Sequence, residues 1–223
     1  MPDGATATES IAIPVRGGQQ IDADLQLPNR ALGLVVFAHG SGSSRFSARN
    51  RAVAESLHAR GFGTLLLDLL TKQEEAVDVY TREYRFDIDR LATRVVIATD
   101  WIQNRKDVRS LATGYFGAST GAAAALIAAV ERPSVVTAVV SRGGRPDLAG
   151  AALPKVTAPT LMIVGARDAP VIELNVEAKV KMKAAHVELA IVPGATHLFE
   201  EPGTLEEVER LAGDWFMRYL KAV

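Results

Sequence analysis

The sequence contains no cysteine, which excludes disulfide bonds, thiolate metal sites and a cysteine nucleophile. It also has no long hydrophobic run. The most apolar stretch, Ala122 to Val130, is far shorter than the roughly 20 residues that a membrane-spanning helix needs. Residues 1–10 are small and polar and lack the apolar core of a signal peptide, so we expect a cytoplasmic protein. Lys and Arg (25) nearly balance Asp and Glu (26), and no run of like charges predicts a nucleic-acid or membrane partner.

Nucleotide-binding motifs are missing as well. There is no G-K-[ST] sequence, which excludes a P-loop. Gly40-Ser41-Gly42 follows an apolar run and begins like the dinucleotide motif G-x-G-x-x-G, but Arg45 stands at the third glycine position. We expect no cofactor and no metal.

The 223 residues, 48% of them hydrophobic, fit one domain that spans residues 1–223. Apolar runs of strand length alternate with helical patterns, which predicts an α/β fold with a mostly parallel sheet and helices on both faces. The expected parallel strands are 33–38, 64–67, 112–116, 135–140, 160–164 and 187–192. The expected helices are at about 49–60, 87–103, 172–183 and 205–220, with another after Ser119. Two alternating segments, 11–15 and 21–27, predict an antiparallel hairpin at the N-terminal edge of the sheet.

The segment Gly117-Ala118-Ser119-Thr120-Gly121 fits the nucleophile motif G-x-S-x-G. It follows an apolar strand and opens an Ala-rich helix, which is the setting that the motif requires. The turn strains the serine backbone, and glycines on both sides remove side chains that would collide with it. The alternative is a Gly-rich turn in which Ser119 merely caps the helix. The strand–turn–helix context favours Ser119 as a nucleophile.

A serine nucleophile needs a base and an acid that orients the base. Hydrolases with this motif have the chain order serine, acid, histidine, which selects His197 as the base because it follows the last strand. His39 then has a structural role in the loop after an earlier strand. Asp168 follows the preceding strand in the turn Gly165-Ala166-Arg167-Asp168 and is the expected acid. Asp147, one strand earlier, is its rival.

The loop that begins with His39-Gly40-Ser41 is expected to supply half of an oxyanion hole. Hydrolases of this kind take one backbone N–H from this loop and one from the residue after the nucleophile. These donors are the N–H groups of Ser41 and Thr120.

Three segments together resemble the α/β-hydrolase superfamily, and more narrowly its dienelactone-hydrolase-related branch. They are H-G-S-G-S-S-R (39–45), F-G-A-S-T-G-A-A-A-A-L (116–126) and G-A-T-H-L-F-E-E-P-G (194–203). They are similar to bacterial hydrolase domains that are sometimes fused to phosphoribosyltransferases. The resemblance implies an α/β-hydrolase fold and a serine hydrolase, in the first place a carboxylesterase. Dienelactone hydrolases themselves have Cys and Glu where this sequence has Ser119 and Gly40.

The substrate is expected to be a small, accessible ester. Residues 141–158 are too few to form the lid domain that larger members insert there. Arg45 and Arg142 follow strands whose carboxyl ends should surround the site, so either could bind a carboxylate or phosphate of the substrate. Two alternatives remain at this point: a binding or regulatory protein without turnover, and an acyltransferase that uses the same residues.

Overall fold

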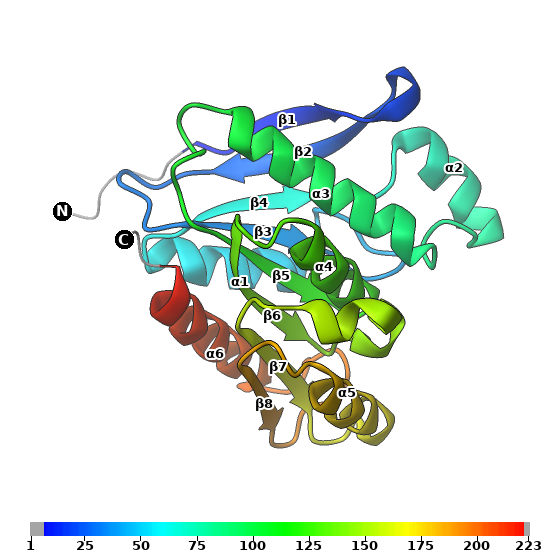
Figure 1. The fold of residues 1–223 in the computed structure, drawn as a ribbon, viewed down its shortest axis with the longest axis vertical. Helices are drawn as coiled ribbons and strands as arrows, with labels where there is room; N and C mark the ends of the chain where they lie inside the picture. Colours follow the sequence, from blue (N-terminus) through cyan, green and yellow to red (C-terminus); the bar gives the residue numbers. More distant parts are fainter. Residues whose placement is uncertain (1–6, 221–223) are drawn as a thin grey trace.

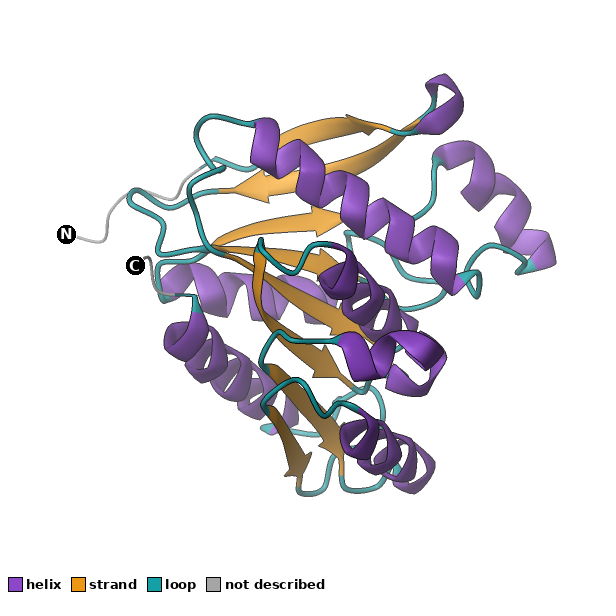
Figure 2. Ribbon diagram, viewed as in Figure 1, coloured by secondary structure: helices purple, strands orange, loops and turns teal. Residues whose placement is uncertain are grey.

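An eight-stranded sheet with helices on both faces organises residues 7–220, the part of the chain that the computed structural model describes (Figures 1 and 2). The strands are β1 (Glu9–Pro14), β2 (Gln20–Gln26), β3 (Leu34–Ala38), β4 (Gly63–Leu67), β5 (Thr113–Ala118), β6 (Val136–Arg142), β7 (Thr160–Gly165) and β8 (Val187–Val192). The helices are α1 (Ala48–Ala59), α2 (Lys72–Thr81), α3 (Ile88–Asn104), α4 (Thr120–Glu131), α5 (Ala169–Lys181) and α6 (Thr204–Tyr219), with short 3-10 segments η1 (Arg16–Gly18) and η2 (Pro146–Lys155).

The strand order is β1-β2-β4-β3-β5-β6-β7-β8. β1 pairs antiparallel with β2, and β2 pairs antiparallel with β4, whereas all later pairs are parallel. This confirms the predicted α/β-hydrolase fold, a mostly parallel sheet with an antiparallel N-terminal edge. Every predicted strand is present, and no end differs by more than two residues.

The core consists of two apolar layers, one on each face of the sheet. Val36 of β3 packs in the layer under α3 and α4, and its neighbours Val35 and Phe37 pack in the layer under α1 and α6. Successive side chains of a strand point to opposite faces, so a strand that is covered on both sides needs a continuous apolar run. That is why β3 to β7 could be located from hydrophobicity alone.

Helix α2 is the element that the sequence did not predict, because its buried side chains are polar: they are Glu74 and Asp78. The helix begins with a capping box, in which Thr71 accepts from the Glu74 N–H at 3.2 Å and the Glu74 carboxylate accepts from the Thr71 N–H at 2.8 Å. Glu74 also accepts from Arg90 at 2.6 Å and from Arg94 at 2.7 Å, both on α3. Charge pairing rather than an apolar face therefore holds α2 in place.

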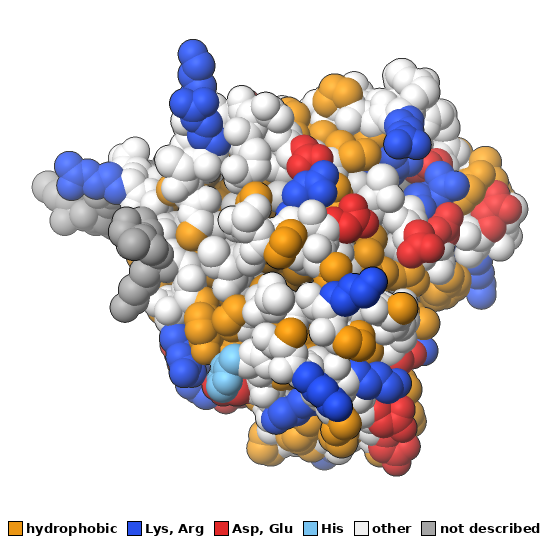
Figure 3. Space-filling view, in the orientation of Figure 1, with side chains coloured by type: hydrophobic (Ala, Val, Ile, Leu, Met, Phe, Trp, Pro, Cys, Tyr) orange, Lys and Arg blue, Asp and Glu red, His pale blue; other side chains and the backbone are white. Residues whose placement is uncertain are grey.

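The connection between β6 and β7 contains η2, which packs against α4 and α5. It forms no separate lid domain, as the sequence predicted. The face in Figure 3 carries basic and acidic side chains interspersed with apolar ones. Within residues 7–220, no helix is both long enough and apolar enough to cross a membrane.

Candidate active site

The carboxyl ends of five parallel strands bring the predicted site together. The loop with Ser41 follows β3, Ser119 follows β5, and Arg142 is the last residue of β6. Asp168 follows β7 and His197 follows β8. Ligands of open α/β sheets bind at this edge. Ser41, Ser119, Arg142 and His197 line a single cavity of about 240 Å³.

Ser119 occupies the strained turn that the motif predicts. Its φ of 50° and ψ of −120° lie outside the regions that L-residues ordinarily adopt. A Cβ on Gly121 would lie 2.2 Å from the carbonyl oxygen of Ala38, and a Cβ on Gly117 would lie 2.5 Å from Cα of Ala122. Both positions therefore require glycine. The Ser119 side chain makes no capping hydrogen bond to α4, so the geometry argues against the helix-cap interpretation.

His197 and Asp168, the expected base and acid, are hydrogen-bonded to each other. The His197 Nδ1–H donates to Asp168 Oδ2 at 2.6 Å, which leaves Nε2 as the nitrogen that can accept a proton. The Asp168 side chain is 14% exposed and that of His197 is 38% exposed. The rival acid, Asp147, is instead held by Arg145 in two hydrogen bonds of 2.8 and 2.9 Å. The geometry thus favours Asp168 as the partner of the imidazole.

His39 anchors the loop after β3, in the structural role that the sequence predicted. Its Nε2 accepts from the Leu69 N–H at 3.1 Å, and its Nδ1–H donates to the Gly40 carbonyl at 2.8 Å. Burial lowers the pKa of His39, which is consistent with a neutral ring that both accepts and donates. Gly40 lies against Ser119, since a Cβ there would be 3.1 Å from Cβ of Ser119.

Both expected oxyanion donors lie near Ser119. Ser41 lines the cavity together with Ser119. Thr120 is the first residue of α4, and the first N–H groups of a helix have no partner within the helix. The positive end of the helix dipole adds to the attraction for a negatively charged oxygen at this place.

The two candidate arginines have different surroundings. Arg45 forms ion pairs with Asp68 and, at 3.5 Å, with Asp24, and its own N–H donates to Asp68 at 2.8 Å. It does not line the cavity beside Ser119. Its ion pairs instead connect the loop after β3 to β2 and to the residue that follows β4.

Arg142 lies inside the cavity and is only 7% exposed. Burial, and next the positive charge of Arg49, lower the pKa of Arg142 to about 10, so its guanidinium stays charged at neutral pH. No carboxylate of residues 7–220 forms an ion pair with it, and its Nε has no hydrogen-bond partner there.

The sequence did not indicate two further residues of the cavity, Arg49 and Asn50 in the first turn of α1. The helix was predicted to begin at about residue 49, but its pattern gave no sign that this turn faces the nucleophile. The lining contains two arginines and neither Asp nor Glu: Gly40, Ser41, Ser43, Ser47, Arg49, Asn50, Ala118, Ser119, Arg142, His197 and Leu198. Within residues 7–220, no group of three His, Asp or Glu side chains is placed to hold a metal ion.

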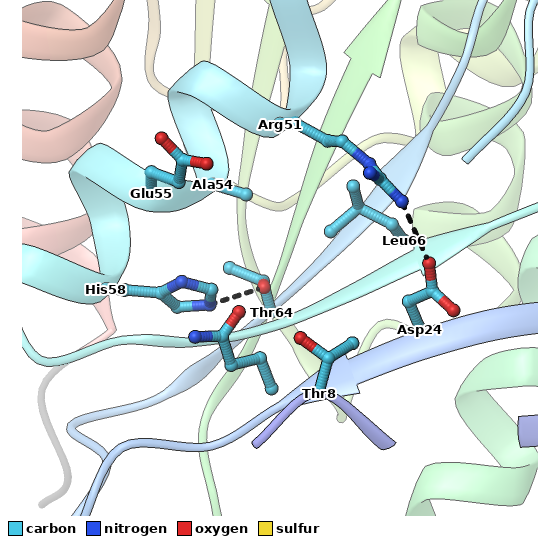
Figure 4. A pocket seen from close by; sticks show the side chains of 9 residues that line it. Thr8, Asp24, Arg51, Ala54, Glu55, His58, Thr64 and Leu66 are labelled. Atoms are coloured by element: carbon cyan, nitrogen blue, oxygen red, sulfur yellow. Dashed lines mark hydrogen bonds and ion pairs between the residues drawn. The ribbon is translucent and has the colours of Figure 1, made fainter. Parts of the chain in front are cut away.

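A separate cavity of about 150 Å³ lies between α1 and strands β2 and β4 (Figure 4). His58 is half-buried there and is hydrogen-bonded to Thr64 Oγ1 at 2.7 Å. Arg51 donates to Asp24 at 3.3 Å across the same cavity. No residue of this lining also lines the cavity of Ser119 and His197, so the two cavities are separate.

Comparison with known proteins shows the family of this chain. Residues 21–221 match the model of the dienelactone hydrolase family. The chain belongs to that family. A crystal structure of dienelactone hydrolase from Anabaena variabilis is 54% identical, with a TM-score of 0.95 over 98% of this chain and 100% of that one. The protein is therefore a member of a hydrolase family.

Two other similarities add context to the family assignment. Putative phosphoribosyl transferases from Mycobacterium tuberculosis are 55% identical over 206 residues, which is 92% of this chain and 45% of those proteins. The chain therefore spans less than half the length of these relatives. Est1E from Butyrivibrio proteoclasticus is 18% identical, with a TM-score of 0.77 over 94% of this chain and 98% of that one, and shares the fold.

Proposed function

We propose that this member of the dienelactone hydrolase family is a serine carboxylesterase, with Ser119 as nucleophile, His197 as general base and Asp168 as the acid that orients the base. The observation that carries the proposal is the 2.6 Å hydrogen bond from His197 to Asp168 beside a strained serine in the same cavity. A strained turn of this kind presents a hydroxyl for reaction, and a carboxylate hydrogen-bonded to Nδ1 fixes the tautomer that can take its proton.

The reaction follows from these positions. Ser119 Oγ attacks the ester carbonyl carbon while its proton passes to His197 Nε2, and Asp168 stabilises the imidazolium. The carbonyl oxygen becomes an oxyanion that accepts from the N–H groups of Ser41 and Thr120. Collapse breaks the bond to the alcohol, which leaves with the proton from His197. Water then attacks the acyl-enzyme with His197 again as base, and releases the acid and free Ser119.

Labelling with a fluorophosphonate tests the proposal, because this reagent phosphonylates an activated serine. The wild type should be labelled at Ser119 and should hydrolyse p-nitrophenyl acetate. Ser119→Ala should abolish labelling and lower kcat by about 10⁶-fold, as removal of the nucleophile does in other triad enzymes. Ser43→Ala removes another serine of the same cavity and should still be labelled. A wild type that neither labels nor hydrolyses esters would contradict the proposal and favour a binding protein on this fold.

Hydrolysis rather than acyl transfer is the simpler use of this site. The His197 side chain is 38% exposed, so water can reach the nitrogen that would activate it. Product analysis separates the two reactions: hydrolysis releases free acid at the rate of alcohol release, whereas transfer to an added amine or alcohol would lower the share of free acid.

A further inference from the structure

The guanidinium of Arg142 is an exception among the arginines near the site. Arg145, three residues after Arg142, is paired with Asp147 at 2.8 Å, and Arg49 reaches Glu200 at 3.1 Å. Arg142 is 7% exposed and has no such partner among residues 7–220. Burying an unpaired charge costs several kcal/mol, so proteins seldom do it without a counter-charge from elsewhere.

The first turn of α1 faces the same cavity. Ser47 caps this helix by accepting from the Asn50 N–H at 3.3 Å. Arg49 and Asn50 line the cavity, Asn50 is 3% exposed, and the buried Arg49 Nε has no hydrogen-bond partner among residues 7–220. The cavity thus combines two guanidiniums with the N-terminus of a twelve-residue helix, which also attracts negative charge.

We infer that this cavity binds a compact oxyanion group of the substrate, a carboxylate or a phosphate monoester at some distance from the scissile ester, with Arg142 as its principal contact and Arg49 as its second. The inference rests on the proposed function and names the substrate class of that site. No Asp or Glu lines the cavity, so no carboxylate within it competes for Arg142, whereas Arg49 is also paired with Glu200 at 3.1 Å. Planar guanidinium donors match the paired oxygens of carboxylates and phosphates.

The position of Arg142 couples this group to the reaction. The Ser119 N–H donates to the Arg142 carbonyl at 3.2 Å, so the backbone of the arginine adjoins that of the nucleophile. An anion held there fixes the ester relative to Ser119 Oγ, and binding energy from a remote group can lower the barrier of the chemical step. Without the anion the guanidinium remains unpaired, which makes neutral esters the poorer substrates.

The test compares a matched pair of esters, mono-4-nitrophenyl succinate, which carries a free carboxylate, and its methyl ester, which is neutral. Arg142→Met should lower kcat/KM for the anionic ester by about 10- to 100-fold, the range expected for a hydrogen bond to a charged group. The neutral ester should change by less than about threefold. Arg145→Met, which removes an arginine outside the cavity, should leave the ratio of the two substrates unchanged. Equal losses on both esters would overturn the inference and make Arg142 a support for the loop, for instance through Phe199, whose ring centroid lies 5.9 Å away.

A binding measurement separates this inference from the proposed function. Inorganic phosphate and succinate should each raise the Tm of the wild type by about 2–4 °C at concentrations well above Kd, because only the folded state binds them. The shift should disappear in Arg142→Met, and the ion that gives the larger shift identifies phosphate or carboxylate as the better ligand. These shifts would stand even if Ser119 proved unreactive. Their absence for both ions would overturn the anion site. Should Arg142→Met not fold, Arg142→Lys and Arg49→Met give the same comparison, each with a smaller loss on the anionic ester alone.

Discussion

His197 and Asp168, 29 positions apart in the sequence, meet at 2.6 Å where β7 and β8 end side by side. Asp168 is also the N-cap residue of α5, yet its side chain makes no capping hydrogen bond. The carboxylate therefore accepts from the imidazole and not from the first N–H groups of the helix, although Asp is among the best capping residues.

This relationship predicts the outcome of two matched substitutions. Asp168→Asn should lower kcat by about 10⁴-fold with little change in KM, because an amide no longer holds the imidazole in the tautomer that can accept a proton. Asp147→Asn should lower kcat by less than about threefold, since Asp147 is paired with Arg145. Steady-state kinetics on p-nitrophenyl acetate measure both. A large loss in Asp147→Asn with a small one in Asp168→Asn would move the acid to the loop after β6.

The stability of the protein should depend on pH through His39. Its ring is buried, and burial lowers its pKa in the folded state below the value of about 6.5 expected in the unfolded chain. As the pH falls below about 6.5, the unfolded state takes up a proton that the folded state refuses. The free energy of unfolding therefore keeps its full value above about pH 6.5. It decreases as the pH falls from there towards the pKa of His39 in the folded state, by up to about 1.4 kcal/mol per pH unit.

Urea unfolding of the wild type and His39→Gln between pH 5 and 8 measures this contribution. Glutamine keeps an oxygen that can accept from the Leu69 N–H but does not titrate in this range. The difference in unfolding free energy should be constant above about pH 7.5 and should shrink as the pH falls below about 6.5, where only the wild type loses this contribution. A constant difference across the whole range would show that His39 does not link folding to proton uptake.

The strengths and gaps of the sequence analysis have the same physical origin. Strands covered on both faces need apolar runs, and G-x-S-x-G between a strand and a helix allows few other structures, so the sheet and the place of Ser119 could be predicted. Helix α2 could not, because Glu74 and Asp78 are buried through charge pairs with residues of other segments. Such charge pairs cannot be predicted from the pattern of apolar residues.

The arginines illustrate the same limit within the site. Arg45 and Arg142 both follow parallel strands, and position along the chain does not distinguish them. The difference arises from their neighbours: strand pairing places Asp22, Asp24 and Asp68 around Arg45, whereas no acid among residues 7–220 pairs with Arg142. Arg49 could not be predicted as a lining residue for a similar reason. The packing of α1 on the sheet decides which of its turns faces Ser119, and the sequence of the helix does not show this.

The size of the cavity predicts the range of acyl groups. It measures about 240 Å³, and η2 between β6 and β7 does not form a lid that would extend it. Among p-nitrophenyl esters, kcat/KM should peak between acetate and butyrate and decline for longer chains. A tunnel for a long chain would give the opposite result, because each buried CH₂ contributes about 0.8 kcal/mol, or about a fourfold rise in kcat/KM per added carbon. Activity should also show no jump when the ester passes its solubility limit.

An adjoining cavity of about 370 Å³ provides the control for this prediction. It lies between the loop after β3 and α2, shares Ser43 with the cavity of the nucleophile, and is lined on its other side by Ala76 and Val79. If the acyl group stays beside Ser119, Ala76→Trp should leave the profile from acetate to octanoate unchanged. A wild-type profile that climbs about fourfold per carbon to octanoate, and that Ala76→Trp flattens, would place the acyl chain in this second cavity and contradict the short-chain prediction.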